Sequence, residues 1–367
     1  MSDKANISET IEIQKDDWKT TRVVNADVDT TLADNEVLLR IDRLALTANN
    51  ISYASAGDSL GYWRFFPAEE GWGRLPAMGW AQVEASAHPA ITEGERVWGF
   101  FPMGTHLKVL AGKVSPQGFT DVSAHREGLA PVYAQFDRAT GNPIYEEARE
   151  DQDSLLRGLF MTSWLVEDFL EVNNFFDARS CLITSASSKT SIALAHCVKQ
   201  RGKLASIAVT SAGNVEFCEG LGCYDKVVTY DAIASLDNSE QVVMVDMAGS
   251  KKILSDLHHH YGDNMKYSCR IGATHFEDFG PVDNLPGATP EFFFAPGHLQ
   301  TRSKELGGAE FMMRLGGAYV GFRQFCDSWL RVERSRGVDG ATAVYQQVLA
   351  GKADPASGQI ISLWQGT

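Results

Sequence analysis

The sequence has no cysteine before residue 181, and none of its six cysteines forms a Cys-x-x-Cys pair. A structural zinc site or a disulfide framework requires clustered cysteines, so the sequence indicates neither. A reducing, cytoplasmic setting is the simplest interpretation of six scattered thiols.

Positive charge is also scarce, because 33 lysines and arginines face 47 aspartates and glutamates, which leaves a formal net charge of −14. Nucleic acids and membrane surfaces attract proteins through basic surface, so no nucleic acid and no membrane is expected as a partner. A small anionic ligand in a locally positive pocket is compatible with this charge.

Long apolar runs are absent too, since no segment reaches the ~18–20 apolar residues of a membrane span. The acidic start, residues 1–17, lacks the apolar segment of a signal peptide. Hydrophobic residues still make up 44% of the 367 positions, which suits a globular protein of about two domains at ~150 residues each. With the other classes excluded, an enzyme is expected.

The first 155 residues contain strand patterns with little helix between them. Val37, Leu39 and Ile41 alternate with Leu38, Arg40 and Asp42, as in a half-buried strand. Apolar runs broken by glycine and proline follow in residues 94–112. The pattern predicts an antiparallel, barrel-like domain.

From residue 156 the pattern alternates between helix and strand. Leu156, Phe160 and Trp164 recur at helical spacing, and the next helix ends at Gly202, a C-cap residue. The apolar strands between the helices predict a parallel sheet that is covered on both faces. Later helices are expected at 303–314 and 339–350, and a last strand at 359–364.

A glycine-free loop follows the first strand of this second part. A dinucleotide site would show G-x-G-x-x-G here, which lets the backbone approach the pyrophosphate at the helix N-terminus. The chain has Ser185-Ala186-Ser187-Ser188-Lys189-Thr190-Ser191 instead. Hydroxyls and Lys189 could replace the backbone donors, a cofactor could bind in a shifted pose, or the site could be inactive. The structural alternative is a serine-rich N-cap with a solvated lysine. The Ser-Ser-Lys-Thr string is also similar to the Walker loop of nucleotide triphosphatases, but the glycines that this loop requires are absent.

No acidic residue follows the second strand, which runs into Thr210-Ser211-Ala212. An Asp or Glu at this place would bind the ribose 2′-hydroxyl of NAD. Its absence leaves room for a 2′-phosphate and favours NADPH over NADH.

Several segments resemble the medium-chain dehydrogenase/reductase superfamily, closest to its zinc-free quinone oxidoreductase and enoyl reductase branch. ERVWGFFPMGTHLKV resembles the superfamily's G-D-R-V strand and the strand after it, and FMTSWLVEDFL resembles the helix before the Rossmann half. CLITSASSKTSIALAHCVKQRG aligns without gaps onto V-x-G-A-A-G-G-V-G-x-x-A-I-Q-L-A-K-x-x-G, while LGCYDKVVTYD and VVMVDMAG resemble L-G-A-D-x-V-I-N-Y and V-D-x-V-G. The stretches SASSKTS, NNISY and FFFAP also resemble a divergent subfamily that is known only as a domain of unknown function.

The resemblance implies an α/β protein with a GroES-like β-barrel catalytic domain and a doubly wound Rossmann domain with a parallel sheet. The expected divisions are 1–155 for the first part of the catalytic domain, 156–300 for the dinucleotide-binding domain and 301–367 for a C-terminal segment that returns to the catalytic domain. The active site would lie in the cleft between the domains. A homodimer is expected, because relatives commonly dimerise through an edge of the Rossmann sheet.

Zinc-dependent relatives carry a Cys and a Gly-His-Glu segment that this chain lacks. Met78-Gly79-Trp80-Ala81-Gln82 stands at the Gly-His-Glu place, so no zinc or other metal is expected. Consecutive His258, His259 and His260 would point ~100° apart on a helix and are interpreted as a solvated helix end.

Without zinc, the developing enolate needs a hydrogen-bond donor and its α-carbon needs a proton. In the enoyl reductase branch a tyrosine in a G-x-Y-P-like loop has a related role, and Gly61-Tyr62-Trp63 takes a comparable place. The resemblance makes Tyr62 the first catalytic candidate and Tyr53 the second, with Trp63 as a substrate contact. An aromatic loop packed on the barrel is the structural alternative. Asn50 stands where relatives have an N-P-x-D turn and either orients substrate or holds that turn.

Strand carboxyl ends face the ligand in an open α/β sheet. Ala248 and Gly249 end one such strand, Gly272 and Thr274 end another, and all four would border the nicotinamide ribose. His275 is a candidate proton donor or substrate contact, or else a loop histidine.

The remaining expected contacts come from the resemblance. Ser211 and Tyr230 match positions that contact the adenosine phosphate in relatives, beside the loop contacts Ser185, Ser187, Ser188, Lys189 and Thr190. Phe294, in an expected edge strand, and Arg302 are substrate candidates. For Arg302 a surface salt bridge is the alternative.

The predicted function is a zinc-independent, NADPH-preferring oxidoreductase that transfers a hydride to an activated, α,β-unsaturated or quinone-like carbonyl of a small-molecule substrate. Two alternatives stay open. One is a degenerate family member that binds a ligand or partner without redox turnover, and the other is non-redox chemistry on a CoA-type ligand.

Overall fold

The computed structural model describes residues 7–271 and 284–366, and the chain divides into two compact units. The barrel unit comprises Met1–Leu155 and Arg331–Thr367, and the Rossmann unit comprises Leu156–Leu330. The Rossmann unit is therefore inserted into the sequence of the barrel unit. None of the helices in the described residues is long and apolar enough to cross a membrane.

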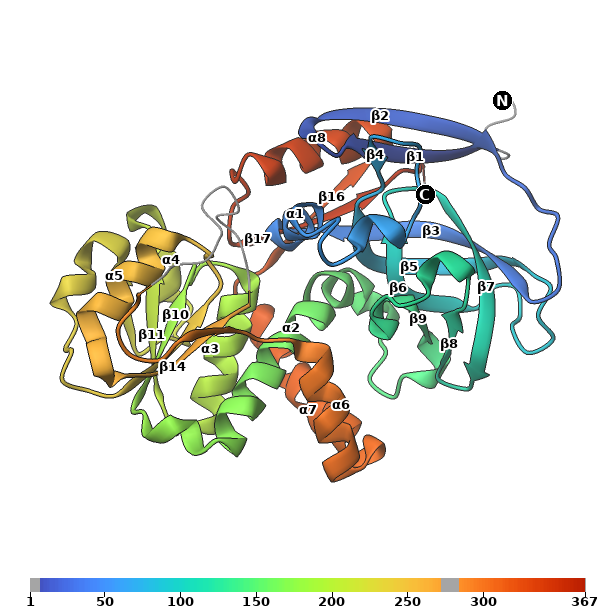
Figure 1. The fold of residues 1–367 in the computed structure, drawn as a ribbon. Helices are drawn as coiled ribbons and strands as arrows, with labels where there is room; N and C mark the ends of the chain where they lie inside the picture. The colour runs from blue at the N-terminus through green and yellow to red at the C-terminus, as the bar shows by residue number, and fades with distance from the viewer. Residues whose placement is uncertain (1–6, 272–283, 367) are drawn as a thin grey trace. The chain divides into compact units, whose positions relative to one another are not determined.

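A closed barrel is the centre of the barrel unit (Figure 1). Its strands follow one another around the barrel in the order β3 (Glu36–Leu46), β5 (Pro76–Ser86), β6 (Arg96–Pro102), β9 (Gln135–Arg138), β8 (Gly118–Asp121) and β7 (His106–Ser115). Antiparallel pairing of β3 with β7 closes the ring. Val37, Leu39 and Ile41 are buried as their alternation predicts, but Leu38 on the opposite face is buried too. Gly79 permits the close approach of β5 to β3, because a Cβ there would lie 2.1 Å from the Arg43 carbonyl oxygen.

The C-terminal segment extends this barrel along β3. The strand β17 (Ser357–Ser362) pairs antiparallel with β3, and β16 (Arg331–Arg336) pairs parallel with β17. The helix α8 (Gly337–Leu349) packs on both strands and on a small sheet of β2 (Asp17–Asp27), β1 (Ile7–Gln14) and β4 (Trp72–Gly73). A short helix, α1 (Ala48–Ser55), follows β3.

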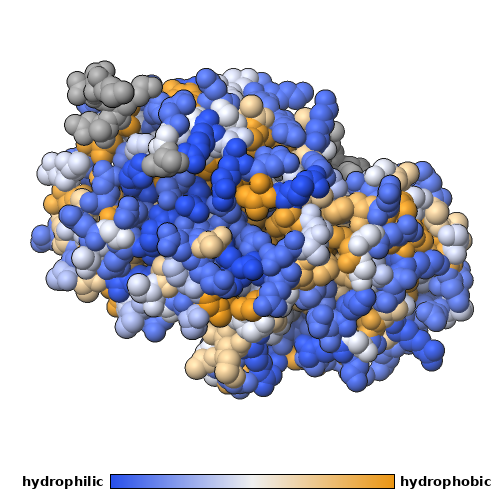
Figure 2. Space-filling view, turned by 180° about the vertical axis from the view of Figure 1, so that it is seen from behind, coloured by the Kyte–Doolittle hydropathy of each residue, from blue (hydrophilic) through white to orange (hydrophobic). Residues whose placement is uncertain are grey.

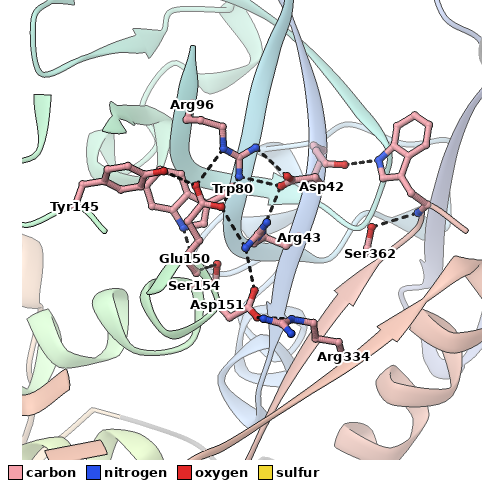
Figure 3. Close-up of polar contacts among 12 residues, drawn as sticks. Asp42, Arg43, Trp80, Arg96, Tyr145, Glu150, Asp151, Ser154, Arg334 and Ser362 are labelled. Carbon is pink, nitrogen blue, oxygen red and sulfur yellow. Dashed lines mark hydrogen bonds and ion pairs between the residues drawn. The ribbon is translucent and has the colours of Figure 1, made fainter. Parts of the chain in front are cut away.

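A network of alternating charges joins distant segments of the barrel unit (Figure 3). Arg96 contacts Asp42 at 2.9 Å and Glu150 at 2.7 Å, and Arg43 contacts Glu150 and Asp151 at 3.2 Å each. Arg334 of β16 also contacts Asp151. The Glu150 and Asp151 side chains are almost fully buried. Three acids and three arginines balance in charge, which is the condition for burying such groups.

The Rossmann unit contains a six-stranded parallel sheet with the strand order of a dinucleotide-binding fold. The order is β12 (Lys226–Thr229), β11 (Ala205–Thr210), β10 (Ser180–Thr184), β13 (Val242–Asp246), β14 (Met265–Arg270) and β15 (Pro290–Phe292). The chain thus builds the sheet outward from β10 to one edge and then to the other. Every residue of the central strands β10 and β13 is buried, as their apolar composition predicts.

Helices of the Rossmann unit pack on this sheet and on one another. They are α2 (Glu150–Val172), which begins in the barrel unit, α3 (Lys189–Arg201), α4 (Val215–Gly220), α5 (Lys251–Tyr261), α6 (Ala295–Leu306) and α7 (Gly308–Cys326). A single helix over 303–314 was expected, but the chain breaks between α6 and α7 at Gly307, whose φ is +82°. A positive φ ends a helix and favours glycine.

Residues 301–330 group with the Rossmann unit, whereas the sequence suggested that they return to the barrel. The cause is aromatic packing between α7 and α2. Phe322 stacks on Phe160 with ring centroids 5.1 Å apart, and Phe311 contacts Trp164 at 5.4 Å. The return to the barrel unit therefore begins at Arg331.

Hydrophilic and apolar residues are unevenly distributed on the face that Figure 2 shows. In Figure 2 strongly hydrophilic residues gather over the barrel unit, and apolar residues are more frequent over the Rossmann unit. Large apolar side chains are exposed on both units, and in the described residues they are Ile7, Val23, Leu60 and Val122 of the barrel unit and Val172, Phe292, Phe294, Met312 and Met313 of the Rossmann unit.

Candidate functional site

The glycine-free loop between β10 and α3 begins with a strained residue. Ser185 takes the place of the first glycine in the superfamily pattern, and its φ is +49°, in the left-handed region that glycine favours. The Ser185 carbonyl accepts a hydrogen bond from the Ser188 backbone N–H at 2.8 Å, and the Ala186 carbonyl accepts one from the Tyr224 hydroxyl at 2.7 Å. The loop therefore keeps the tight turn that glycine normally supplies.

Hydroxyls replace glycine where α3 meets the sheet. Ser188 is the N-cap of α3, and its hydroxyl accepts the Ser191 backbone N–H at 3.2 Å. Ser191, at the last glycine position of the loop in that pattern, is fully buried and donates its hydroxyl to the Thr184 carbonyl at 2.9 Å. A hydrogen bond from the Ser191 hydroxyl thus makes the close contact between α3 and β10 that a glycine without a side chain normally permits.

Half-buried hydrogen-bond donors surround the N-terminus of α3. Ser187, Ser188, Lys189 and Thr190 are all partly exposed, and the Asn214 amide donates to the hydroxyls of Ser187 at 2.9 Å and Ser211 at 3.1 Å. A helix N-terminus with hydroxyls and an ammonium group attracts anions through its dipole and its donors. This donor set fits the phosphates of a dinucleotide.

Tyr230 lies beside the same loop, where it hydrogen-bonds with Ser185. Burial raises the pKa of Tyr230 to about 12, although the contact with Ser185 acts in the opposite direction. The side chain is therefore protonated at neutral pH and stays a hydrogen-bond donor. The structure brings together Ser185, Tyr230, Ser187 and Ser211, which were expected to contact a cofactor.

A buried acid that the sequence did not single out holds the turn after β13. The Asp246 carboxylate accepts the Thr184 hydroxyl at 2.7 Å and the backbone N–H groups of Ala248 and Gly249 at 3.1 and 3.2 Å. Burial raises the pKa of Asp246, and these donors oppose the rise. Ala248 and Gly249 are thus fixed at the carboxyl end of their strand by inward hydrogen bonds. Gly272, Thr274 and His275 lie outside the described residues.

Three tyrosines form an aromatic cluster in the barrel unit. The rings of Tyr53, on α1, and Tyr62, in the one-turn helix 62–64, lie 4.6 Å apart, and Tyr133 lies 5.7 Å from Tyr62. The Tyr62 and Tyr133 hydroxyls are hydrogen-bonded at 3.4 Å. Phe65 and Phe100 complete the cluster. Tyr133 was not predicted, because it lies 71 residues from Tyr62 in sequence and only tertiary packing joins them.

Burial and the neighbouring tyrosine Tyr133 raise the pKa of Tyr62 above its usual value, and the pKa of Tyr53 is raised chiefly by burial. Both hydroxyls therefore stay protonated at neutral pH. Such a group donates a hydrogen bond to a developing negative charge more readily than it releases its proton.

An ion pair lies against this cluster. Arg126 contacts Asp121 at 2.6 Å, both side chains are about 98–99% buried, and the guanidinium lies 5.0 Å from the Phe66 ring centroid. Burial lowers the pKa of Arg126, and Asp121 opposes the decrease. The pair places a fixed positive group behind the aromatic rings.

Two predicted substrate contacts have packing roles. Asn50 accepts the Thr47 backbone N–H at 2.7 Å and donates to the Pro76 carbonyl at 2.8 Å, so its amide holds the turn before α1. Trp63 is 5% exposed and lies against Gly57 and Gly73, where an added Cβ would approach its indole within 2.0 and 2.5 Å. The structure supports the turn-holding alternative for Asn50 and makes Trp63 a core residue.

The other two substrate candidates differ in exposure. Phe294 is 55% exposed at the N-cap of α6. Arg302, on α6, forms ion pairs with Asp168 at 2.8 Å and with Glu305, and His298 also contacts Asp168. Arg302 is therefore the salt-bridged residue of the alternative interpretation.

Metal ligands do not gather in the part of the chain that the structure describes, where no group of three His, Cys, Asp or Glu side chains could hold an ion. Trp80, at the Gly-His-Glu place, is fully buried and donates to the Glu150 carbonyl at 3.1 Å. The expected solvated helix end is wrong for His258, which is buried with its ring nitrogens 2.9 Å from the Pro286 carbonyl and the Ser268 hydroxyl.

Solved structures with the same fold include proteins whose titles name NADPH or a reductase. CurA from Vibrio vulnificus in complex with NADPH matches with a TM-score of 0.65 and 12% identity over 98% of this chain and 100% of that chain. A putative NADPH:quinone reductase from Bacillus thuringiensis (TM-score 0.56, 13% identity) and a mutant enoyl thioester reductase from Candida tropicalis (TM-score 0.58, 14% identity) each cover 97% of this chain and 99% of their own. At these identities the likeness shows the fold.

Sequence comparison identifies the family, whereas the structural neighbours show only the fold. Among curated proteins, none matches this sequence. A family model described as "Protein of unknown function (DUF2855)" matches residues 44–354. The match covers most of both units, and it confirms the divergent subfamily that the loop and the aromatic segments predicted. The chain belongs to the DUF2855 family, and it shares its fold with the solved structures named above.

Proposed function

We propose that the protein is a zinc-independent, NADPH-preferring oxidoreductase acting on an activated carbonyl, such as an enone or a quinone. The observation that carries the proposal is the start of α3, where half-buried hydroxyls and Lys189 surround a helix N-terminus beside the central strand of the sheet. This is the place where dinucleotide-binding folds hold a pyrophosphate. The NADPH titles of the structural neighbours support the same cofactor.

NADPH, when bound, supplies the hydride. In the Rossmann unit Ser187, Ser188, Lys189 and Thr190 hold phosphate oxygens, while Tyr230 and Ser211 serve the adenosine side. The absence of an acid after β11 leaves room for a 2′-phosphate.

In the barrel unit Tyr62, whose hydroxyl donates to Tyr133 in this structure, would redirect that donor to the carbonyl oxygen on which negative charge develops, and Tyr133 holds the hydroxyl in place until then. The aromatic rings around it exclude water and suit a substrate with an apolar portion. After hydride transfer to an enone, the α-carbon of the resulting enolate takes a proton from solvent, whereas a reduced quinone takes its proton from solvent on oxygen. The homodimer expected from the superfamily is part of the proposal.

Binding of NADPH tests the proposal directly. Titration against the fluorescence of the eight tryptophans should give saturable binding that is tighter for NADPH than for NADH. The Lys189→Ala variant should bind NADPH roughly ten- to a hundredfold more weakly, because a charge-assisted hydrogen bond contributes about 1.5–3 kcal/mol.

The matched control is Lys203→Ala, which removes an exposed lysine just beyond the other end of α3. Its NADPH affinity should equal that of the wild type. Wild-type protein that binds neither nucleotide near millimolar concentration would contradict the proposal.

The second candidate function is binding without redox turnover, and the loop itself favours it. Ser185 is strained at φ +49°, and the Asn214 amide already occupies Ser187 and Ser211. This candidate predicts that nucleotide binding is absent or that bound NADPH is not oxidised by any quinone or enone. Following absorbance at the NADPH band with 1,4-benzoquinone as acceptor distinguishes the two.

A further inference from the structure

A groove of about 470 Å³ lies among the helices α2, α3 and α7 of the Rossmann unit. Phe160 and Trp164 of α2 and His196 and Gln200 of α3 line it together with Gly317 and Gly321 of α7. The volume falls in the ~300–1,000 Å³ range of small-molecule sites. All of these residues belong to one unit, so the groove is a property of that unit alone.

The groove exists because α7 has small residues on the side that faces it. A Cβ built at Gly317 or Gly321 would meet no atom within 4 Å. Glycine inside a helix is less stable than alanine, so local helix stability does not account for glycine at either position. The space above them is open to a ligand.

His196 is a buried polar side chain at this groove. It is 8% exposed, and no hydrogen bond of its side chain is found among the residues that the structure describes. Its ring lies 4.9 Å from Phe325 and 5.5 Å from Phe322, which fix it on one side. Burial lowers the pKa of His196 to about 4, so at neutral pH one ring nitrogen is a donor and the other an acceptor.

The two charged side chains that line the groove, Arg201 and Glu167, are paired with each other. Arg201 donates two hydrogen bonds to the buried Glu167 carboxylate, at 2.8 and 2.7 Å, and also contacts Glu171. Arg201 is thus already paired with carboxylates, so an anionic ligand would have to compete with them for it. The aromatic walls of Phe160 and Trp164 suit a flat ring, and the His196 edge and the Gln200 amide offer both donors and acceptors.

The groove is separate from the proposed cofactor site. The cofactor loop lies at the start of α3, whereas His196 and Arg201 lie seven and twelve residues further along the helix, about 10–18 Å at ~1.5 Å per residue. A dinucleotide phosphate on the loop would leave the groove accessible.

We propose that this groove binds an uncharged, planar heteroaromatic small molecule that presents both a hydrogen-bond donor and an acceptor to His196. The site does not depend on the oxidoreductase function. Ligand binding to the groove and NADPH binding to the cofactor loop are measured separately, so one can be absent while the other is present.

Benzimidazole is a suitable probe, because it is flat, neutral at pH 8 and carries one donor and one acceptor. Isothermal titration and two-dimensional NMR of the histidine rings would follow its binding to the full chain, with the His196 resonances identified from a His196→Phe variant. The proposal expects saturable binding that perturbs the His196 ring nitrogens. His196→Phe, which keeps the ring and removes the nitrogens, should weaken binding at least fivefold.

Gly321→Leu fills the groove without a clash, since its Cβ has open space. It should weaken benzimidazole binding at least tenfold and leave NADPH binding unchanged. Gly317→Leu is the second variant if the first is poorly folded. The matched control is Gly220→Leu on α4, whose Cβ also meets no atom within 4 Å, and it should bind the probe as the wild type does.

Three results would overturn the proposal. They are no saturable benzimidazole binding, binding that survives both leucine variants, and binding that His196→Phe leaves unchanged. A change of molecular mass in Gly321→Leu, measured by light scattering, would show that a second copy of the chain occupies the groove instead of a small molecule.

Discussion

His196 makes the stability of the protein depend on pH. Its pKa falls from 6.5 to about 4 on burial, so between these values the unfolded chain binds more protons than the folded one. The free energy of unfolding is therefore not reduced by His196 above pH 6.5, and it decreases as the pH falls from 6.5 toward 4. At pH 5 this group should cost roughly 2 kcal/mol relative to pH 7.5.

Urea denaturation of wild type and His196→Gln at both pH values measures this cost. The wild type should lose more stability than the variant by that amount, because the other histidines titrate in both proteins. Equal losses would show that His196 is protonated in the folded state at pH 5.

Tyr62 carries the second prediction at the scale of single residues. Tyr62→Phe should reduce kcat with NADPH and 1,4-benzoquinone by about a hundredfold, the usual loss of one donor to a developing oxyanion. Tyr133→Phe should reduce kcat less, since its hydroxyl acts through Tyr62. NADPH affinity should not change in either variant.

Tyr345→Phe is the control for loss of a tyrosine hydroxyl in the barrel unit. The Tyr345 hydroxyl donates to the Trp18 carbonyl at 2.7 Å and is remote in sequence from the cluster. It should cost stability and leave kcat as in the wild type. An unchanged kcat in Tyr62→Phe would remove this residue from the proposed mechanism.

At the scale of elements, two helices with the same kind of cap separate capping from phosphate binding. Ser188 caps α3 and Ser250 caps α5, each through its hydroxyl and the backbone N–H three residues later. Ser188→Ala and Ser250→Ala should each lower the free energy of unfolding by about 1 kcal/mol. Only Ser188→Ala should also weaken NADPH binding, as measured by fluorescence titration. An equal loss of NADPH affinity in both variants would mean that destabilisation alone explains it.

The same elements show what the sequence can predict. Short apolar strands followed by amphipathic helices determine a parallel sheet, so β10 to β14 and their order follow from periodicity and from the superfamily pattern. The break at Gly307 was missed because apolar spacing continues across it, and only the backbone φ of +82° reveals the end of α6. In the candidate site the loop residues were predictable because they are contiguous. Tyr133 and Asp246 were not, since their partners lie 71 and 62 residues away.

At the scale of the whole molecule, the charge network couples the two sequence segments of the barrel unit. Glu150 contacts Arg43 and Arg96, and its neighbour Asp151 contacts Arg334 from the C-terminal segment (Figure 3). Glu150→Gln should lower the free energy of unfolding by roughly 2 kcal/mol. This is less than the ~3–5 kcal/mol for a fully buried pair, because both arginines are partly exposed.

Glu147→Gln, one turn earlier and exposed, is the matched control and should have no measurable effect on stability. Denaturant titrations followed by circular dichroism measure both variants. A Glu150→Gln protein as stable as the control would mean that Asp42 and Asp151 suffice to hold the arginines.

The insertion of one unit into the other also sets an order of events during synthesis. The ribosome releases the barrel strands first, then the whole Rossmann unit, and β17 only near the end. Until then Leu44, Ala45 and Leu46 of β3 lack their partners Gln359, Ile360 and Ile361, and an unpaired apolar edge invites pairing with other chains. A nascent chain that pauses inside the Rossmann unit would therefore expose the unpaired edge of β3 to other chains. A chaperone would prevent aggregation most effectively during this interval.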